Sequence, residues 1–257
     1  NALVHSTKSV TAASAVVTLT DNAYAVSNSK LNASDLSAIG GKTSGNVTAS
    51  AAIRMRGTQS EVKAALIGDS SIIAGAAGTT AEISDDVSAS EGAEIVDVNN
   101  VTGIFEGGVT DAFASLVTVG GAATTGDVNK IVGQDADVDI TVNDSSGTFA
   151  ATDVVALGAK TSGTVTVSNA VTITGAQADV TNALVHATKS VTAASAVVTI
   201  NDSSGTLAAT DLSAIGAKTS GTVTVSNGIT ISGAQADVTN ALVHSTKSVT
   251  AASAVVT

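Results

Sequence analysis

Histidine is the side chain best suited to proton transfer and metal binding near neutral pH, and the 257-residue sequence contains three of them. His5, His186 and His244 occupy one repeated position, because a lysine follows each of them three residues later. The numbers of the last two differ by 58 (244 − 186), which corresponds to two coils of the internal repeat. If coils are separated by one strand spacing, that is about 10 Å, which is too far for shared metal ligation. We therefore interpret the histidines as copies of one repeat position and predict no catalytic or metal-binding residue among them.

Nucleophilic catalysis needs a serine, threonine or cysteine beside a base in one particular place. The sequence has many Ser and Thr, but no Cys, no Gly-x-Ser-x-Gly motif before a helix and no His in a unique context. Glycine-rich stretches at residues 75–78 and 120–121 lack the Lys-Ser/Thr ending of a phosphate-binding loop. We therefore predict no enzyme activity, no catalytic residues and no cofactor.

Aspartates recur at one corner of the repeats, each just after an expected strand. They are Asp21, Asp85 with Asp86, Asp144 and Asp202. Asp favours such turns because its side chain can hydrogen-bond the nearby backbone, and this is the interpretation we prefer. The alternative is a calcium ion that bridges neighbouring coils through these carboxylates.

Two further charged stretches could contact a partner. In residues 135–139 (Asp-Ala-Asp-Val-Asp), strand alternation would place all three carboxylates on one face, which we expect to be solvated; a bound cation is the alternative. In residues 53–56 (Ile-Arg-Met-Arg), the same alternation would point Arg54 and Arg56 outward together. We interpret these arginines as an ordinary exposed pair, with a docking spot as the alternative.

The composition excludes several classes of protein. Asp and Glu number 22 against 11 Lys and Arg, a net charge of −11 that repels nucleic acid and anionic lipid. Without cysteine, the chain cannot be a disulfide scaffold, a cysteine-ligated zinc module or a thiol enzyme. No apolar run approaches the roughly 18 residues of a membrane helix, and residue 1 does not open a signal peptide, so we expect no membrane span and an export signal elsewhere, or an excerpt of a longer chain.

Internal repeats are the strongest signal in the sequence. Asn-Asp-Ser-Ser-Gly-Thr begins at Asn143 and again at Asn201, which gives a period of 58 (201 − 143). The period divides into half-repeats of 26 (237 − 211) and 32 (58 − 26). Residues 1–18 are identical to residues 240–257, at an offset of 239, or four periods plus seven. We expect the parent polypeptide, or a head-to-tail neighbour, to continue past residue 257 as it does past residue 18, with Leu, Thr, Asp and Asn.

Each half-repeat predicts one short helix and two short strands. The apolar spacing predicts a helix over residues 207–218 whose buried face begins at Leu207, with Thr210 or Asp211 as its cap and Gly216 as its end. Alternation predicts strands at 222–226 and 229–231, at 190–193 and at 197–200. The side chains expected to point inward are Val223, Val225, Ile229 and Ile231, and one period earlier Val165, Val167, Val171 and Ile173.

Two folds could use this unit. The one we favour is a β-rich repeat solenoid of stacked coils of about 26–32 residues, because only 2% of the residues are aromatic and small side chains suit internal ladders. The alternative is a tandem array of ferredoxin-like α+β domains, one for each period of 58, with a hairpin at Asn227-Gly228. We divide residues 1–257, as one continuous array, into a partial repeat at 1–18, divergent two-coil units at 19–83 and 84–142, and two-coil units at 143–200 and 201–257.

Residues 210–225 read Thr-Asp-Leu-Ser-Ala-Ile-Gly-Ala-Lys-Thr-Ser-Gly-Thr-Val-Thr-Val. This stretch resembles the repeat regions of very large secreted bacterial surface proteins, notably of cyanobacteria, with hemolysin-like or adhesin-like annotation and type I secretion. The resemblance implies an extracellular or cell-surface location. The calcium-binding pattern Gly-Gly-x-Gly-x-Asp of that group is not matched at Gly40, Gly107 or Gly120, so calcium binding does not transfer with it.

These observations support a structural function. We expect a non-catalytic repeat module of an extracellular filament, surface layer or giant adhesin, whose partners are copies of itself, head-to-tail or lateral, and cell-surface components. The alternative is a binding module that presents exposed Thr and Ser ladders to polysaccharide or ice, with or without calcium. Thr222-Val223-Thr224 favours such a ladder, whereas Ser190-Val191-Thr192 in the other half interrupts it. A polysaccharide lyase would need a unique group of carboxylates with Arg or Lys, which the sequence does not contain.

Overall fold

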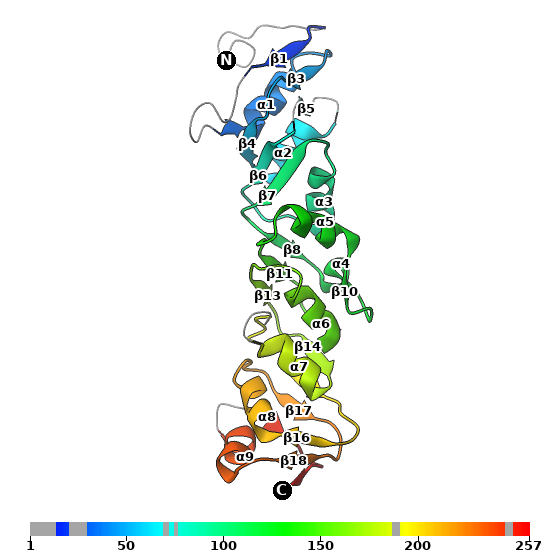
Figure 1. Ribbon diagram of the computed structural model, residues 1–257, viewed down its shortest axis with the longest axis vertical. Helices are drawn as coiled ribbons and strands as arrows, with labels where there is room; N and C mark the ends of the chain where they lie inside the picture. Colours follow the sequence, from blue (N-terminus) through cyan, green and yellow to red (C-terminus); the bar gives the residue numbers. More distant parts are fainter. Residues whose placement is uncertain (1–13, 21–29, 69–71, 75–76, 187–190, 245–248) are drawn as a thin grey trace. The chain divides into compact units, whose positions relative to one another are not determined.

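The computed structural model describes residues 14–20, 30–68, 72–74, 77–186, 191–244 and 249–257 (Figure 1). Contacts divide the chain into two compact units. The first unit comprises Asn1–Val109 and Lys130–Val138, and the second comprises Thr110–Asn129 and Asp139–Thr257. Both are α/β, with many short strands, mostly parallel, and short helices between them.

The elements are short throughout, as a repeat of this length requires. The helices are α1 Ala33–Gly40, α2 Gln59–Leu66, α3 Ala89–Val96, α4 Phe113–Leu116, α5 Gly126–Gln134, α6 Ala151–Gly158, α7 Gln177–Leu184, α8 Ala209–Gly216 and α9 Gln235–Leu242. The strands are β1 Val17–Leu19, β2 Leu31–Asn32, β3 Val47–Ala49, β4 Arg54–Gly57, β5 Ile72–Ala74, β6 Thr79–Ile83, β7 Val101–Phe105, β8 Val109–Asp111, β9 Val117–Thr118, β10 Ala123–Thr124, β11 Ile140–Val142, β12 Thr148–Ala150, β13 Val165–Val167, β14 Thr172–Gly175, β15 Val197–Ile200, β16 Thr206–Ala208, β17 Val223–Val225, β18 Thr230–Ser232, β19 Val249–Thr250 and β20 Val255–Val256.

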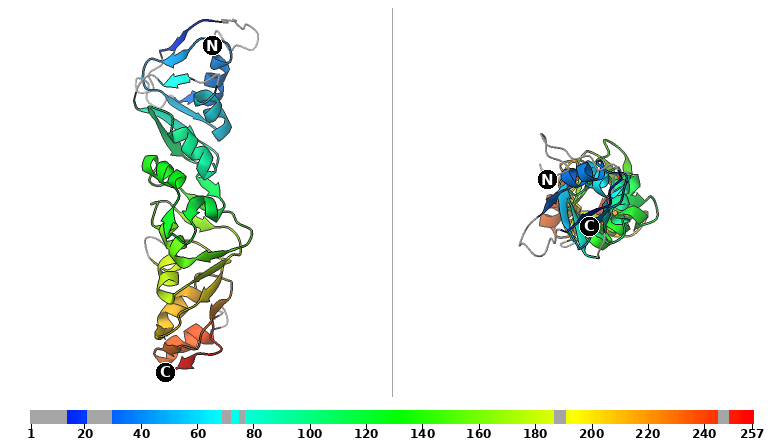
Figure 2. Two further views of the ribbon diagram at one scale, coloured as in Figure 1. Left: turned by 90° about the vertical axis from the view of Figure 1, so that its right-hand side faces the viewer. Right: turned by 90° about the horizontal axis from the view of Figure 1, so that it is seen from above.

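The second unit repeats strand, helix and strand, as the sequence predicts. Its helices α6 to α9 begin at intervals of 26, 32 and 26 (177 − 151, 209 − 177 and 235 − 209), which confirms the two half-repeat lengths. Each helix packs on strands of its own coil, for example α8 on β16 and α7 on β14 (Figure 2). Neighbouring helices also contact each other, α6 with α7 and α8 with α9.

Strands of the second unit pair in parallel with the equivalent strands of the next coil. Thr148 lies opposite Thr172, and Val223 lies opposite Val249, so the partners are offset in number by 24 (172 − 148) and 26 (249 − 223). Strands β17 and β18 lie in different sheets, so they form no hairpin at Asn227-Gly228. In the described residues, the antiparallel pair is β9 with β10. The pairing therefore differs from that expected for tandem ferredoxin-like domains.

Strand β15 is paired on both sides. Val198 lies opposite Ile173 of β14 and opposite Val223 of β17, which joins the strands into a five-stranded sheet in the order β12-β14-β15-β17-β19. A second sheet of this unit has the order β16-β18-β20 and repeats the pairing of β12, β14 and β15 one full period later in the sequence. The period of the sequence is thus also present in the strand pairing, because equivalent strands pair with equivalent residues opposite one another.

Small apolar side chains from the strands and helices fill the interior of each coil. All eight side chains that we predicted to point inward are 4% exposed or less, which confirms the alternation of the strands. An aromatic pair is added where Phe113 of α4 stacks on Phe149 of β12, with ring centroids 4.0 Å apart. Burying this apolar surface is the main source of stability of such a coil.

The predicted helix over residues 207–218 is wrong at its start. Leu207 lies in β16, and α8 begins at Ala209 immediately after the strand. Thr210 and Asp211 are therefore inside the first turn, and the capping position is Ala208, which makes no side-chain hydrogen bond. The prediction failed because the strand runs into the helix without a linker, so buried residues of both elements mimic one helical face.

The first unit contains a sheet in the order β2-β4-β6-β7. Met55 of β4 lies opposite Leu31 and Ala81 in this sheet, and its side chain is fully buried. Helices α2 and α3 begin with complete capping boxes, Thr58 with Glu61 and Ser88 with Glu91. These local caps fix where both helices begin.

Candidate functional site

The most regular polar feature of the second unit is a row of threonines across the five-stranded sheet. Thr174, Thr199, Thr224 and Thr250 lie opposite one another on β14, β15, β17 and β19. Their neighbours along each strand, such as Ile173 and Val198, are fully buried, so the threonines face the opposite side of the sheet. We call these four residues the threonine ladder.

The ladder supplies one hydroxyl on each of four neighbouring strands, whereas the fifth strand, β12, has Ala150 at this position. Strands in a sheet are spaced about 4.8 Å apart, so the hydroxyls form a row with that repeat. A shorter row occurs in the same unit, where Thr141, Thr166 and Thr192 lie opposite one another. Such rows can hydrogen-bond a ligand that repeats at the same spacing, but they contain no base or nucleophile pair for catalysis.

Three of the predicted corner aspartates cap a helix of the preceding coil. Asp85 accepts a hydrogen bond from Gln59 N at 2.5 Å, Asp144 from Phe113 N at 2.6 Å and Asp202 from Gln177 N at 2.7 Å. Each donor is the first residue of a helix, α2, α4 and α7 respectively. A carboxylate there satisfies a free N–H group and stabilises the positive end of the helix dipole. This differs from the predicted turn, because the bond is made 25 to 31 residues away rather than locally.

Aspartates at the third residue of a helix make a second kind of contact between coils. Asp153 of α6 is fully buried and accepts from Gly120 N and Ala122 N, both at 2.7 Å. Asp211 of α8 accepts from Gln177 Nε2 at 3.0 Å. From the sequence we expected Thr210 or Asp211 to cap its own helix and assigned no role to Asp153, although the repetition of Asp in this phase was a signal for a contact between coils.

A cluster of charged residues lies on the four-stranded sheet of the first unit. Glu82 is paired with Lys30 Nζ and, at 2.8 Å, with Arg54 Nη2, and its side chain is only 3% exposed. Glu106 accepts from Arg56 Nη2 at 2.5 Å. We call these five residues the charged cluster. Arg54 and Arg56 do share one side of β4, as predicted, but they are paired with glutamates rather than forming a simple exposed pair.

Two opposing effects set the pKa of Glu82. Burial raises the pKa of this carboxyl, while its contacts with the Lys30 ammonium and the Arg54 guanidinium lower it, and the net result is a pKa below the ordinary value of 4.5. Glu82 is therefore ionised near neutral pH. Its single negative charge is shared between two cations, so the charged cluster as a whole has three cations for two carboxylates.

The predicted shared face of the acidic stretch 135–139 is wrong. Asp135 and Asp137 lie in a turn that follows α5, so strand alternation does not apply to them. Asp135 accepts from Phe105 N at 2.6 Å, and its pKa is raised by burial and by the nearby Asp137 carboxyl. Asp139 has a different partner from Asp135: it accepts hydrogen bonds from Thr164 N and Thr164 Oγ1, both at 2.7 Å.

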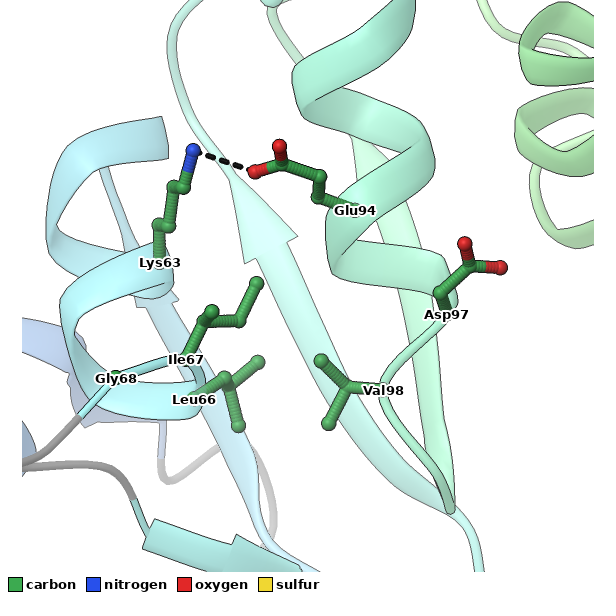
Figure 3. A pocket seen from close by; sticks show the side chains of 7 residues that line it. All are labelled: Lys63, Leu66, Ile67, Gly68, Glu94, Asp97 and Val98. Atoms are coloured by element: carbon green, nitrogen blue, oxygen red, sulfur yellow. Dashed lines mark ion pairs between the residues drawn. The ribbon is translucent and has the colours of Figure 1, made fainter.

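A groove in the first unit lies between the C-terminal ends of α2 and α3 (Figure 3). Its volume is about 690 Å³. The ion pair of Lys63 with Glu94, at 2.5 Å, crosses one end, and the Glu94 carboxylate raises the pKa of Lys63. The side chains that line the groove are Lys63, Leu66, Ile67, Glu94, Asp97 and Val98, with Gly68 beside them. Leu66, Ile67 and Val98 give the groove an apolar wall, and the other side chains that line it are charged.

The structure describes two of the three histidines. His186 and His244 are exposed, while His5, like Asp21, lies outside the described residues. Over the described ranges, no group of three or more His, Cys, Asp or Glu side chains is placed to hold a metal ion. In the same part of the chain, no helix has both the length and the hydropathy needed to cross a membrane.

Comparison of the chain with protein-family models, with curated proteins and with solved structures gives no match. Function must therefore be inferred from the chain's own contacts.

Proposed function

We propose that this chain is a structural repeat module of an extracellular filament, surface layer or giant adhesin, without catalytic activity. One observation carries the proposal: the polar groups that could do chemistry are repeated, and their partners lie in neighbouring coils. Asp144 and Asp202 cap helices of the preceding coil, and Asp153 holds backbone N–H groups more than 30 residues away. Side chains used in this way hold neighbouring coils together and do not form a reaction centre.

The pairing of the strands supports a solenoid as the architecture of the module. In a solenoid, equivalent strands of successive coils pair in parallel, and each coil contacts only its neighbours. The pairing of β16 with β18 and of β18 with β20, each one coil further along the chain, has this form, and so do the contacts of α8 with α9. An acidic, regularly built array of this kind suits a role as spacer or coat outside the cell.

Imaging of the intact parent assembly, together with its localisation, tests the proposal. We expect a repeating filament or layer at the cell surface, with a spacing set by the coils. A parent protein found as a discrete monomer in the cytoplasm would contradict it. So would turnover of a substrate by the purified chain.

The threonine ladder favours a second candidate function, binding to a lattice-like ligand such as polysaccharide or ice. Its four hydroxyls share one face and one register, which is the arrangement that a repeating ligand requires. Thr199 and Thr224 are partly exposed, and Thr250 is exposed. This face could bind without disturbing the core.

Replacing Thr199 and Thr224 by valine tests this candidate, because valine keeps the shape and the strand preference of threonine but removes its hydroxyl. We expect the double variant to lose retention on immobilised polysaccharides, or inhibition of ice recrystallisation, if either is present in the unmodified chain. Thr210→Val, at an exposed position of α8, is the control. Binding that survives the double substitution, or no binding by the unmodified chain, rules the ladder out.

A further inference from the structure

Asn227 and Gly228 form the only Asn-Gly dipeptide in the sequence. They lie at the corner between β17, which ends at Val225, and β18, which begins at Thr230. Asparagine is a thermolabile residue, because the backbone nitrogen of the next residue can attack its side-chain amide. Attack is easiest when the next residue is glycine, which has no Cβ to hinder the approach and adopts backbone conformations that other residues avoid. The corner therefore holds the two groups that this reaction needs.

The side chain of Asn227 joins its corner to the preceding coil. Its Nδ2 donates to Asn201 O at 3.1 Å and to Asp202 O at 2.8 Å. Asn227 is half-buried, whereas Gly228 is exposed. Within the described ranges, the backbone N–H of Gly228 makes no hydrogen bond. Water can therefore reach this nitrogen and take its proton.

The equivalent corner one period earlier has the same contacts but a different following residue. Asn169 Nδ2 donates to Asn143 O at 3.1 Å and to Asp144 O at 3.0 Å. Asn169 is half-buried, as Asn227 is, and the next residue, Ala170, is exposed. The two asparagines therefore differ chiefly in the Cβ of the residue that follows them, and the earlier corner is an internal control for the later one.

We propose that Asn227 is a site of spontaneous covalent modification, at which its side-chain amide closes on the Gly228 nitrogen and is then hydrolysed to isoaspartate and aspartate. The proposal selects one corner of the array, because the equivalent Asn169 is followed by alanine. It goes beyond the proposed structural function and does not depend on it.

Water is the co-reactant in both steps of the modification. In the first step, a bond forms from Gly228 N to Asn227 Cγ, the proton of Gly228 N passes to water, and the side-chain nitrogen takes up a proton and leaves as ammonia. In the second step, water adds to either carbonyl group of the cyclic imide and breaks the bond from that carbonyl carbon to nitrogen. Opening on one side gives aspartate, and opening on the other gives isoaspartate. Neither step is an oxidation or a reduction.

The modification changes how two coils meet. An ionised carboxylate only accepts hydrogen bonds, so the product cannot donate to Asn201 O and Asp202 O as the amide does. It places a negative charge beside these two carbonyl oxygens. The same loop carries the Asp202 carboxylate, which caps α7 by accepting from Gln177 N at 2.7 Å, and like charges repel. A contact that joins two coils thus becomes a repulsive one.

Incubation of the full 257-residue chain at neutral and mildly alkaline pH, followed by peptide mapping with mass spectrometry, tests the site. We expect isoaspartate and aspartate to accumulate at position 227 while Asn169 remains intact. Gly228→Ala should abolish the product, because it recreates the earlier corner with Ala170. The added Cβ has room in the fold, since its nearest atom is Ser253 O at 3.3 Å.

Ala170→Gly is the reciprocal variant, because it places an Asn-Gly dipeptide at the earlier corner. We expect it to create product at Asn169 and to leave the reaction at position 227 unchanged. Together the two variants separate the effect of glycine from any difference in the surroundings of the two corners.

Asn227→Asp tests the effect of the modification on the contact between coils. We expect a loss of amide-exchange protection at Gln177, because the loop that carries its cap is no longer held by the Asn227 side chain. Ser204→Asp is the matched control: it adds the same charge at an exposed position of that loop without removing a hydrogen bond. It should leave Gln177 protected.

An Asn227 that stays intact overturns the proposal. So does product that forms equally at Asn169, that persists in Gly228→Ala, or that fails to appear at Asn169 in Ala170→Gly. Equal protection of Gln177 in Asn227→Asp and Ser204→Asp would overturn the effect assigned to the modification. These results would leave the structural function standing, whereas turnover of a substrate by the purified chain would contradict that function and leave the modification standing.

Discussion

Glu82 is the most deeply buried member of the charged cluster and contacts two cations, Arg54 on the neighbouring strand β4 and Lys30, which directly precedes β2. We expect Glu82→Gln to lower the free energy of unfolding by about 1–2 kcal/mol near neutral pH, less than for a fully buried pair, because Lys30 and Arg54 can turn toward solvent. The pKa of Glu82 is lowered in the folded chain, so its contribution is complete above the ordinary value of 4.5 and disappears as pH falls through the lower, folded value. Denaturant unfolding across this range measures the difference.

The control for Glu82 is Glu94→Gln. Glu94 is also paired with a lysine, but its side chain is 52% exposed, so the change should have little effect at any pH. A Glu82→Gln effect that is equally small, or that grows as pH falls, would contradict the role given to the cluster.

Gly221 lies where two coils touch. A Cβ on this residue would be 2.2 Å from Ala196 O, and Gly45 has the same relation to Ala15 O at 2.3 Å. Backbone atoms cannot move aside cheaply, so we expect Gly221→Ala to cost about 2 kcal/mol or more of unfolding free energy. Gly133→Ala in α5 meets no atom within 4 Å and should be neutral or slightly stabilising. Equal effects of the two changes in thermal or denaturant unfolding would show that the coils do not approach this closely.

At the scale of elements, α7 depends on a residue outside its own coil. Asp202 accepts from Gln177 N, and we expect Asp202→Ala to cost about 1 kcal/mol, as the loss of a helix cap does. Faster amide exchange in the first turn of α7 would locate the effect. Ser203→Ala changes the neighbouring exposed residue and should leave that turn unaffected. If both variants exchange alike, Asp202 is not a cap.

The sequence predicted the elements better than the links between them. The strands were recognised because small buried residues alternate with threonine, as in Val223-Thr224-Val225. The role of Asp202 could not be read locally, because its partner lies 25 residues earlier and is determined by how the coils stack. The charged cluster was not predicted for a related reason. Glu82 follows Arg54 by 28 residues, in a part of the chain where the repeat has diverged. Without a clear repeat, the sequence does not indicate that the strands of these two residues are neighbours.

At the scale of the whole chain, identical segments in different surroundings give a direct measure of coil stacking. Val197 N donates to Val171 O at 2.8 Å, and its copy Val255 N donates to Ile229 O at 2.9 Å. The two amides have the same local sequence and hence the same intrinsic exchange rate. In dilute, monomeric samples we expect Val197 to be protected at least about tenfold more, because β15 has strands on both sides and β20 on one. Equal protection would mean that a following coil adds no stability.

The capping by corner aspartates has a direction along the chain. In all three cases the acid lies later in the sequence than the helix that it caps, by 26, 31 and 25 residues. When a polypeptide emerges from a ribosome or a narrow channel with its N-terminus first, a helix such as α7 therefore gains its cap only after Asp202 of the next coil has also emerged. Full stabilisation of each such helix should therefore follow its emergence with a lag of about one coil, which leaves the most recently emerged helix the least stable one.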